Sequence, residues 1–140
     1  MFDKYFDDWE VKPQFKREYV SLWPSWLGKE NIHMLDQVTK EEWSRFNSFI
    51  LAISQIYKLG LVDCNAGSVT FPVNIESTLS DYSGSMNKDS SVFSKYVIPE
   101  LDCVLTEEWD YTYIIWHKHN SAVDALIPYI LASKLQHFST

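Results

Sequence analysis

Apolar and polar positions are patterned most clearly in the last third of the chain. Residues 101–105 have the pattern of a short β-strand and residues 109–118 that of a longer one, with Glu107 and Glu108 in the turn between them. The longer segment has apolar or aromatic side chains on both faces, whereas a strand with one face in water alternates apolar with polar residues. We therefore predict that 109–118 is the central strand of a sheet and pairs antiparallel with 101–105.

Two helices are expected in the first half of the chain. Thr39 and Glu42 form a capping box, in which each side chain accepts a hydrogen bond from the other residue's backbone N–H. A wide apolar stripe follows, so we predict a largely buried helix over 39–59 that stops at Gly60 in a left-handed conformation. A narrower stripe with a proline in its first turn predicts another helix over 13–23.

A third helix is expected over 121–134. Ser121 and Asp124 form a second capping box ahead of an apolar stripe. Pro128 lies within the stripe, where a proline kinks or splits a helix. Residues 135–138 either finish this helix or add a last strand.

Shorter elements are expected elsewhere. The first ten residues have aromatic side chains at helical spacing, which predicts a short amphipathic helix or an ordered arm packed on the domain. Two short strands are predicted over 61–64 and 69–73, and Pro72 places the second at a sheet edge because it cannot donate to a ladder. The serine-rich segment 74–90 predicts a long loop.

A short helix is expected after that loop. Ser90 or Ser91 would cap it, and it would run through Val97 before Pro99 ends it.

These elements predict a single domain over residues 1–140, of the α/β or α+β class. We expect a small sheet whose central strand is about 109–118, packed by three or more helices. The composition agrees, since 46% of the 140 residues are hydrophobic and 22% are charged, as in globular proteins. A chain of this length buries about two-thirds of its unfolded surface, which is enough for a core without disulfides.

The negative charge is concentrated in one segment. The chain has a formal net charge of −7, and residues 63–110, with nine acidic residues and two lysines, account for all of it. Phosphate binding needs a basic surface, so nucleic acid is not an expected partner. A basic protein is the natural partner for such a segment, and the competing interpretation is a solvated acidic face that maintains solubility.

The cysteines and the N-terminal residues indicate a reducing, cytoplasmic environment. Cys64 and Cys103 lie in apolar, strand-like surroundings and do not make a disulfide framework. The first residues, MFDKYFDDWE, carry carboxylates where a signal peptide has a basic region. No apolar run approaches the roughly 20 residues that span a membrane, so no membrane partner is expected.

A set of polar residues at the predicted hairpin offers metal or catalytic chemistry. His117 and His119 share one face of the predicted strand and are candidate metal ligands, although a His-x-His pair commonly just ends a strand. Cys103, across the hairpin from His117, is a candidate nucleophile, and a buried structural thiol is the competing interpretation. A third metal ligand would have to come from Glu107, Glu108, His33 or His137.

The alternative function is therefore a small hydrolase, metal-dependent or using acid–base catalysis. Its site would combine His117 and His119 with the carboxylates of Glu107, Glu108 and Asp110. The chain has four glycines, and none is arranged as a phosphate-binding loop. No cofactor is expected. A third hypothesis is an aromatic cleft for a small ligand such as a sugar, which needs a concave surface lined by tryptophan.

The size, the acidic charge and the hairpin followed by a helix (DCVLTEEWDYTYIIWHK, then the helix from Ser121) resemble small acidic bacterial immunity proteins of toxin–immunity systems. The resemblance implies tight, electrostatically steered inhibition of a basic toxin such as a nuclease, with carboxylates in the place of phosphates. We therefore expect a non-enzymatic protein-binding module, and the sequence sets no oligomeric state.

The expected contact surface lies within residues 63–110. Tyr82 is the expected aromatic anchor, because it sits in a polar loop. Turn positions tolerate substitution, so charge reversal at Glu107 and Glu108 is expected to slow association without unfolding the chain. The candidate contact residues are Glu76, Asp81, Tyr82, Glu107, Glu108 and Asp110.

Overall fold

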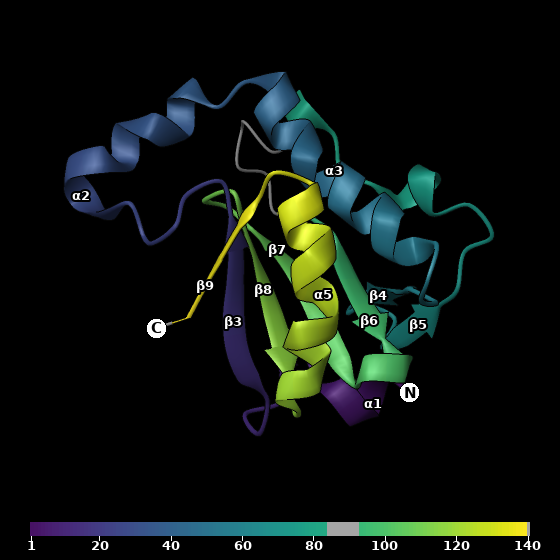
Figure 1. The fold of residues 1–140 in the computed structure, drawn as a ribbon. Helices are drawn as coiled ribbons and strands as arrows, with labels where there is room; N and C mark the ends of the chain where they lie inside the picture. Colours follow the sequence, from purple (N-terminus) through teal and green to yellow (C-terminus); the bar gives the residue numbers. More distant parts are fainter. Residues whose placement is uncertain (84–92, 140) are drawn as a thin grey trace.

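Among residues 1–83 and 93–139, which the computed structural model describes, a seven-stranded antiparallel sheet runs through the centre of the protein (Figure 1). Its strands are β3 (Lys16–Ser21), β4 (Gly60–Asp63), β5 (Ser68–Thr70), β6 (Lys95–Ile98), β7 (Cys103–Glu108), β8 (Thr112–His117) and β9 (Gln136–Phe138). Their order is β5–β4–β6–β7–β8–β3–β9. The main helices, α3 (Lys40–Ser54) and α5 (Asn120–Ala132), pack on one face. The α+β class is confirmed.

The β7–β8 hairpin lies at the centre of the sheet, and the predicted antiparallel pairing is confirmed. Strand β8 lies between β7 and β3, so it has a strand on each side. The register runs from Cys103 opposite His117 to Glu108 opposite Thr112. A strand in this position needs cover on both faces, as its apolar pattern predicted.

The turn of this hairpin is formed by residues 109–111, so its predicted position at Glu107 and Glu108 is wrong. Both glutamates continue strand β7, where the backbone N–H of Glu107 donates to the carbonyl of Ser94 at 2.9 Å. Tyr111 has a φ of 56°, in the left-handed region that allows the chain to reverse.

Strand β3 occupies the segment predicted as a helix over 13–23, and that prediction is wrong. Tyr19 packs beside Trp26 on one face of the strand, and Val20 belongs to the main core on the other. The neighbours of β3 are β8 and β9, both from the last third of the chain. Pairing with such distant strands overrides the local helical spacing.

Strand β6 lies where the end of a short helix was predicted, and that prediction is also wrong. It runs between β4 and β7, with Tyr96 in the core under the helices and Val97 in the core on the opposite face. A short apolar run buried on both faces is typical of a central strand. The predicted caps, Ser90 and Ser91, lie outside the described residues, as does the end of the loop predicted over 74–90.

The helix α3 begins as predicted. Thr39 Oγ1 accepts a hydrogen bond from the Glu42 backbone at 3.1 Å, and Glu42 Oε1 accepts one from the Thr39 backbone at 3.2 Å. The helix ends at Ser54 rather than at 59, and Gly60 begins β4 instead of forming a left-handed stop. A glycine is needed there because a Cβ atom would clash with Val69.

The helix α5 is confirmed, but its predicted capping box is wrong. His119 is the N-cap residue and its side chain makes no capping hydrogen bond, so Ser121 lies inside the helix. The helix continues through Pro128 as one element. Residues 136–138 then form β9, the strand that was one of the two predicted alternatives.

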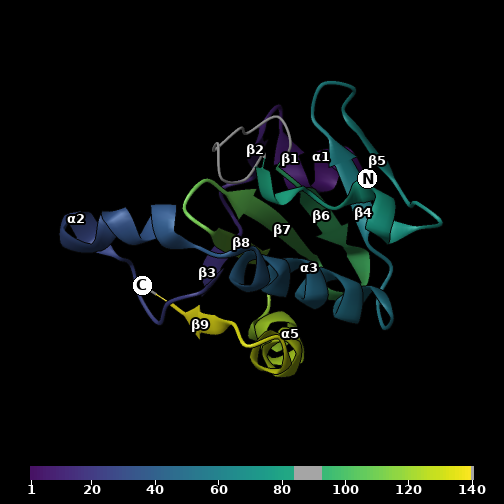
Figure 2. The ribbon, with the colours of Figure 1, turned by 90° about the horizontal axis from the view of Figure 1, so that it is seen from above.

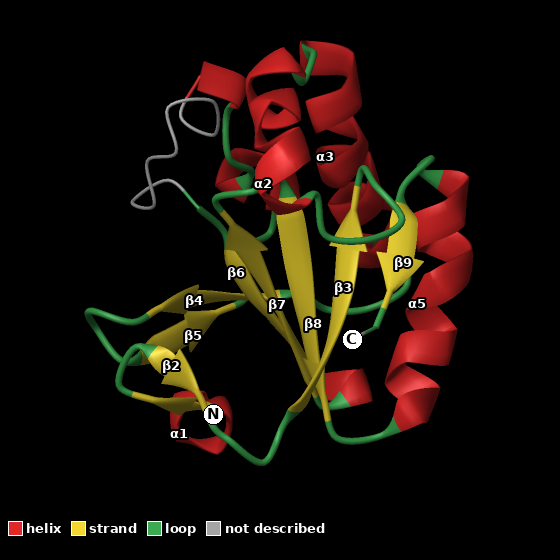
Figure 3. Ribbon diagram, turned by 90° about the vertical axis from the view of Figure 1, so that its left-hand side faces the viewer, coloured by secondary structure: helices red, strands yellow, loops and turns green. Residues whose placement is uncertain are grey.

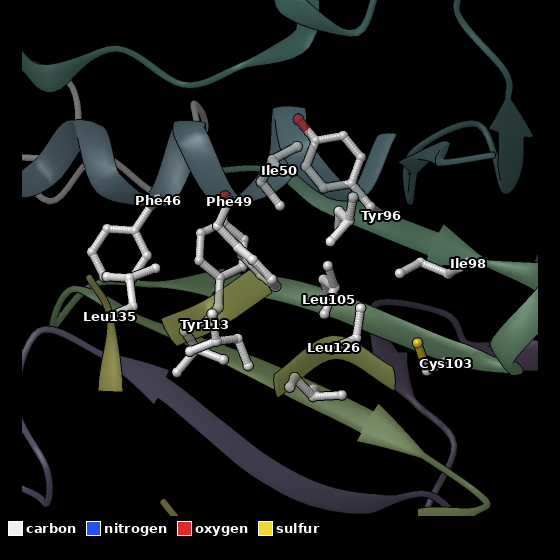
Figure 4. Packing of buried hydrophobic residues seen from close by; sticks show 14 of the residues in the cluster. Phe46, Phe49, Ile50, Tyr96, Ile98, Cys103, Leu105, Tyr113, Leu126 and Leu135 are labelled. Carbon is white, nitrogen blue, oxygen red and sulfur yellow. The ribbon is translucent and has the colours of Figure 1, made fainter. Parts of the chain in front are cut away.

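The two faces of the sheet carry separate cores. On the first, Phe49 of α3 and Leu126 of α5 pack against sheet residues such as Leu105 (Figure 4). On the second lie α1 (Phe2–Tyr5) and a ribbon of β1 (Phe6–Asp7) and β2 (Glu10–Val11) (Figures 2 and 3). Tyr5 and Phe6 of this N-terminal arm are buried there. The prediction of an ordered arm is confirmed.

Short helices complete the described chain: α2 (Gly28–Asn31), and the 3-10 helices η1 (Ile32–Gln37), η2 (Ile75–Thr78) and η4 (Pro99–Leu101). The helices α2 and η1 project from one end of the sheet (Figure 1). Strand β5 is an edge strand, as Pro72 predicted. None of the described helices is long and apolar enough to cross a membrane.

The two residues predicted to cap helices, Thr39 and Ser121, give a matched test, because only Thr39 caps a helix in the structure. Thr39→Ala should lower the free energy of unfolding by about 1 kcal/mol, because it leaves the Glu42 backbone N–H without its acceptor. Ser121→Ala should change it by less than about 0.5 kcal/mol, because Ser121 does not cap α5. Urea unfolding of both variants measures the difference, and equal losses would contradict it.

Candidate binding site at the hairpin turn

Three carboxylates that are close in sequence lie in three different environments at one end of the hairpin. Glu107 points into the core under α3, and Glu108 points to the opposite face of the sheet, because successive strand residues face opposite ways. Asp110 lies beyond the strand, in the turn. The expected single acidic surface at the hairpin is therefore divided.

Glu107 is a structural residue. It is 9% exposed, and its Oε1 accepts a hydrogen bond from the backbone of Ser94 at 2.8 Å while its Oε2 accepts one from Ser80 Oγ at 3.1 Å. The carboxylate thus joins two segments that lie on either side of residues 84–92. The expectation that charge reversal here leaves the fold intact is not supported, because a lysine would bring a cation to two hydrogen-bond donors.

Glu108 borders a groove between the N-terminal arm and the sheet. The groove has a volume of about 410 Å³ and is lined by Phe6, Trp9, Glu10, Val11, Lys95, Thr106, Glu108 and Trp116. Burial raises the pKa of Glu108, and a hydrogen bond with Thr106 and the charge of Lys95 oppose this. The Lys95 ammonium lies 5.6 Å from the centre of the Trp9 ring, and Trp116 Nε1 donates to Thr106 at 2.9 Å. The polar groups of this groove therefore interact with one another.

Asp110 borders a second concave surface, which we call the tryptophan pocket. It has a volume of about 280 Å³ and lies between the hairpin turn and the chain that follows β3. Trp26 and Trp109 at its rim are 47% and 48% exposed. The lining residues are Ser21, Trp23, Ser25, Trp26, Leu27, Gly28, Lys29, Ile32, Leu35, Trp109, Asp110 and Thr112.

The position of Trp26 in this pocket is fixed by stacked aromatic rings. Its ring lies edge-on to Tyr19, with centroids 4.7 Å apart, and edge-on to Phe138, with centroids 5.1 Å apart. Tyr19 and Phe138 are cross-strand partners on β3 and β9. The sheet therefore holds one wall of the pocket, although Trp26 itself lies outside any strand or helix.

The carboxylate of Asp110 is unusual because one of its oxygens is buried without a partner. Oδ1 has no hydrogen-bond partner among the described residues. Burial raises the pKa of Asp110, while hydrogen bonds from the Thr112 side chain and from the backbone favour the charged form. A buried polar atom without a partner costs free energy, and this carboxyl group also lines the pocket.

The other candidate contact residues lie apart from this pocket. Glu76 is exposed on η2 and lines a groove at the C-terminal end of α3, and Asp81 is exposed. Tyr82 packs against Trp43 near the start of α3, with ring centroids 5.9 Å apart, and donates to the Val38 carbonyl at 2.7 Å. The reason given for choosing Tyr82, its place in a polar loop away from the core, therefore does not hold.

The residues proposed for a hydrolase are not brought together. His117 lies opposite Cys103 at one end of the hairpin, and Glu108 lies five positions along β7, roughly 17 Å away at the usual rise of a strand. His117 is buried beneath α5, which lowers its pKa, and its Nδ1 lies 3.2 Å from the His119 carbonyl. Among the described residues, no group of three or more His, Cys, Asp or Glu side chains could hold a metal ion.

The proposed Cys103–His117 pair is adjacent but not activated. Burial raises the pKa of the Cys103 thiol to about 12, so it is protonated at neutral pH, whereas a nucleophilic cysteine is a thiolate. His137, another proposed ligand, instead has its Nε2 3.5 Å from Glu18 Oε1, and His33 is exposed on η1.

Comparison with known proteins adds no relative. No protein-family model, no curated protein and no solved structure matches this chain.

Two residues of the tryptophan pocket, Trp23 and Trp26, were not selected from the sequence. The available signal was the irregular segment SLWPSWLGKE, in which Trp23 directly precedes Pro24 and Trp26 lies between Pro24 and Gly28; burial of a tryptophan in a regular core is not expected there. Their distance in sequence from Asp110 concealed the relationship.

Removal of the Glu107 carboxylate should destabilise the fold. Glu107→Ala leaves the Ser94 N–H and the Ser80 hydroxyl without their acceptor, so the free energy of unfolding should fall by roughly 2 kcal/mol or more. Glu76→Ala, at an exposed carboxylate, should change it by less than about 0.5 kcal/mol. Similar values for the two variants in urea unfolding would show that Glu107 is not structural.

Asp110→Asn should leave the fold at least as stable as the wild type at pH 7. Burial raises the folded-state pKa of Asp110 above its ordinary value of 3.8, so this group favours folding below that value and loses the benefit as pH rises through the folded pKa. The free energy of unfolding of the variant should therefore exceed that of the wild type by more at pH 7 than at pH 3. Thermal unfolding at both pH values measures it, and a variant less stable at pH 7 would contradict the assignment.

Proposed function

We propose that this chain is a non-enzymatic protein-binding module, and that it acts in the cytoplasm as an immunity-type inhibitor of a basic toxin. The observation that carries the proposal is the unpartnered carboxylate oxygen of Asp110 beside two half-exposed tryptophans. Tryptophan is enriched among the residues that dominate protein–protein binding. A carboxylate that can accept a further hydrogen bond makes such a surface selective for positively charged partners.

The charge around this end of the sheet supports a basic partner. Asp81 is exposed in the segment that Glu107 fixes to the sheet, and Asp36 lies close enough to Tyr111 to contribute to its raised pKa. Asp110 and Asp36 therefore bring negative charge to the hairpin turn from two different segments. A surface of one sign raises the rate at which an oppositely charged partner is captured.

The gene neighbourhood and a protection assay test this function. A toxin gene immediately upstream of the gene for this chain supports it, and co-expression of the chain should then restore growth to cells that produce the toxin. Neighbouring genes for metabolic enzymes alone, or cells that are not protected, would contradict it.

The association rate with that toxin should depend on charge at the turn. Asp81→Asn combined with Asp110→Asn should slow association several-fold at low ionic strength and flatten its salt dependence, because local attraction is removed. Asp3→Asn combined with Asp124→Asn makes the same change in net charge at exposed positions elsewhere and is the control. Stopped-flow measurements that show equal slopes for both variants would place the interface elsewhere.

A further inference from the structure

We propose that the tryptophan pocket receives an arginine side chain, whose guanidinium group binds the Asp110 carboxylate between the rings of Trp26 and Trp109. The proposal rests on the proposed function in one respect, because the arginine belongs to the protein partner. It assigns a chemical group to the pocket that can be tested without that partner.

The carboxylate sets the first requirement for the occupant. Asp110 lines the pocket, and its buried Oδ1 has no donor among the described residues, so rotation of the carboxyl group toward the pocket would let a ligand supply the donor that Oδ1 lacks. A neutral donor would satisfy the hydrogen bond but would leave the negative charge uncompensated in a poorly solvated place. A cationic donor meets both needs, and charge-assisted hydrogen bonds are roughly twice as strong as neutral ones.

The walls of the pocket select among cations. Tryptophan has the most favourable ring for cation–π contact, and arginine makes such contacts more often than lysine. A guanidinium group is planar, stacks on aromatic faces and is more weakly hydrated than an ammonium group, so it loses less solvation on entering an apolar pocket. With Trp23, Leu27, Ile32 and Leu35 as further walls, the pocket favours arginine over lysine.

The chain does not supply this cation itself. Lys29 is the basic residue among the described ones that line the pocket, and it is exposed on α2 with no ion pair to Asp110 within 4.0 Å. Its ammonium group would repel a cation at the pocket mouth. Removal of Lys29 should therefore strengthen binding of the proposed ligand.

The exposure of the walls also indicates an occupant. Trp26, Ile32 and Trp109 are 47%, 50% and 48% exposed around one concavity. Large apolar side chains gathered at one place on a surface mark interaction sites, whereas isolated ones need no explanation. Tryptophan and arginine are also the residues most enriched at the energetic centres of protein interfaces.

The test uses the full chain and Nα-acetyl-arginine methylamide as the probe. Titration is followed by the indole N–H signals of the six tryptophans in ¹H–¹⁵N spectra, assigned by Trp26→Phe and Trp109→Phe. We expect saturable shifts of the Trp26 and Trp109 signals with a dissociation constant on the order of 1 mM, as for a single side chain without its protein. The citrulline analogue, which has the same shape without the charge, should bind at least tenfold more weakly.

Three substitutions make the test specific. Asp110→Asn should weaken binding at least tenfold, and Lys29→Met should strengthen it. Glu108→Gln removes a neighbouring carboxylate on the other face of the sheet; its charge interacts with that of Asp110, so this variant should weaken binding much less than Asp110→Asn. Absence of shifts at Trp26 and Trp109, equal binding of the citrulline analogue, or unchanged binding by Asp110→Asn would each overturn the proposal, as would tighter binding of the lysine analogue.

Titration with the arginine probe and the toxin-protection assay test the two proposals separately. A chain that protects against its toxin but does not bind the arginine probe would overturn the assignment of the pocket and leave the inhibitor function. A chain that binds the probe at Asp110 and protects against no toxin would support the pocket and overturn the inhibitor function.

Discussion

The structure depends on a central hairpin whose two faces are both covered by other parts of the chain. Strands β7 and β8 have neighbours on both sides and apolar residues on both faces, so each face needs its own cover. The helices α3 and α5 supply one, and the N-terminal arm supplies the other through Tyr5 and Phe6. The arm is thus part of the folding unit: without it, Val97 and Val104 of the sheet would meet solvent.

The alternation of side chains along β7 then decides what each carboxylate can do. Glu107 faces the core and can be tolerated there because two donors from other segments meet it. Glu108 faces the opposite side, where burial raises its pKa and Thr106 and Lys95 oppose that rise. Asp110 follows the strand and is placed by the left-handed turn at Tyr111. Residues that look like one acidic cluster in the sequence are therefore separated by the geometry of a single strand end.

The parts of the fold that were predictable are those specified by local chemistry. The capping box of Thr39 and the two-sided apolar pattern of residues 109–118 identified α3 and the central strand, because both signals lie within a few residues. Strands β3 and β6 were not identified, because their stability comes from partners distant in sequence. The burial of Glu107 was not predicted for the same reason. Its hydrogen-bond donors come from Ser80 and Ser94, and no residue close to Glu107 in the sequence indicates them. The tryptophan pocket likewise joins segments about 80 residues apart, as two loops at one sheet end.

Glu107 and Asp110 together show why the pocket is better explained by binding than by folding. Where a buried carboxylate has a structural role, this chain provides a donor for each oxygen, as at Glu107. At Asp110 one oxygen has none among the described residues, and the tryptophans beside it remain half exposed. Both features oppose stability, since a buried polar atom prefers a partner and an exposed indole prefers burial. A cationic, stacking ligand would relieve both at once, and departures from local stability rules are expected where a protein binds.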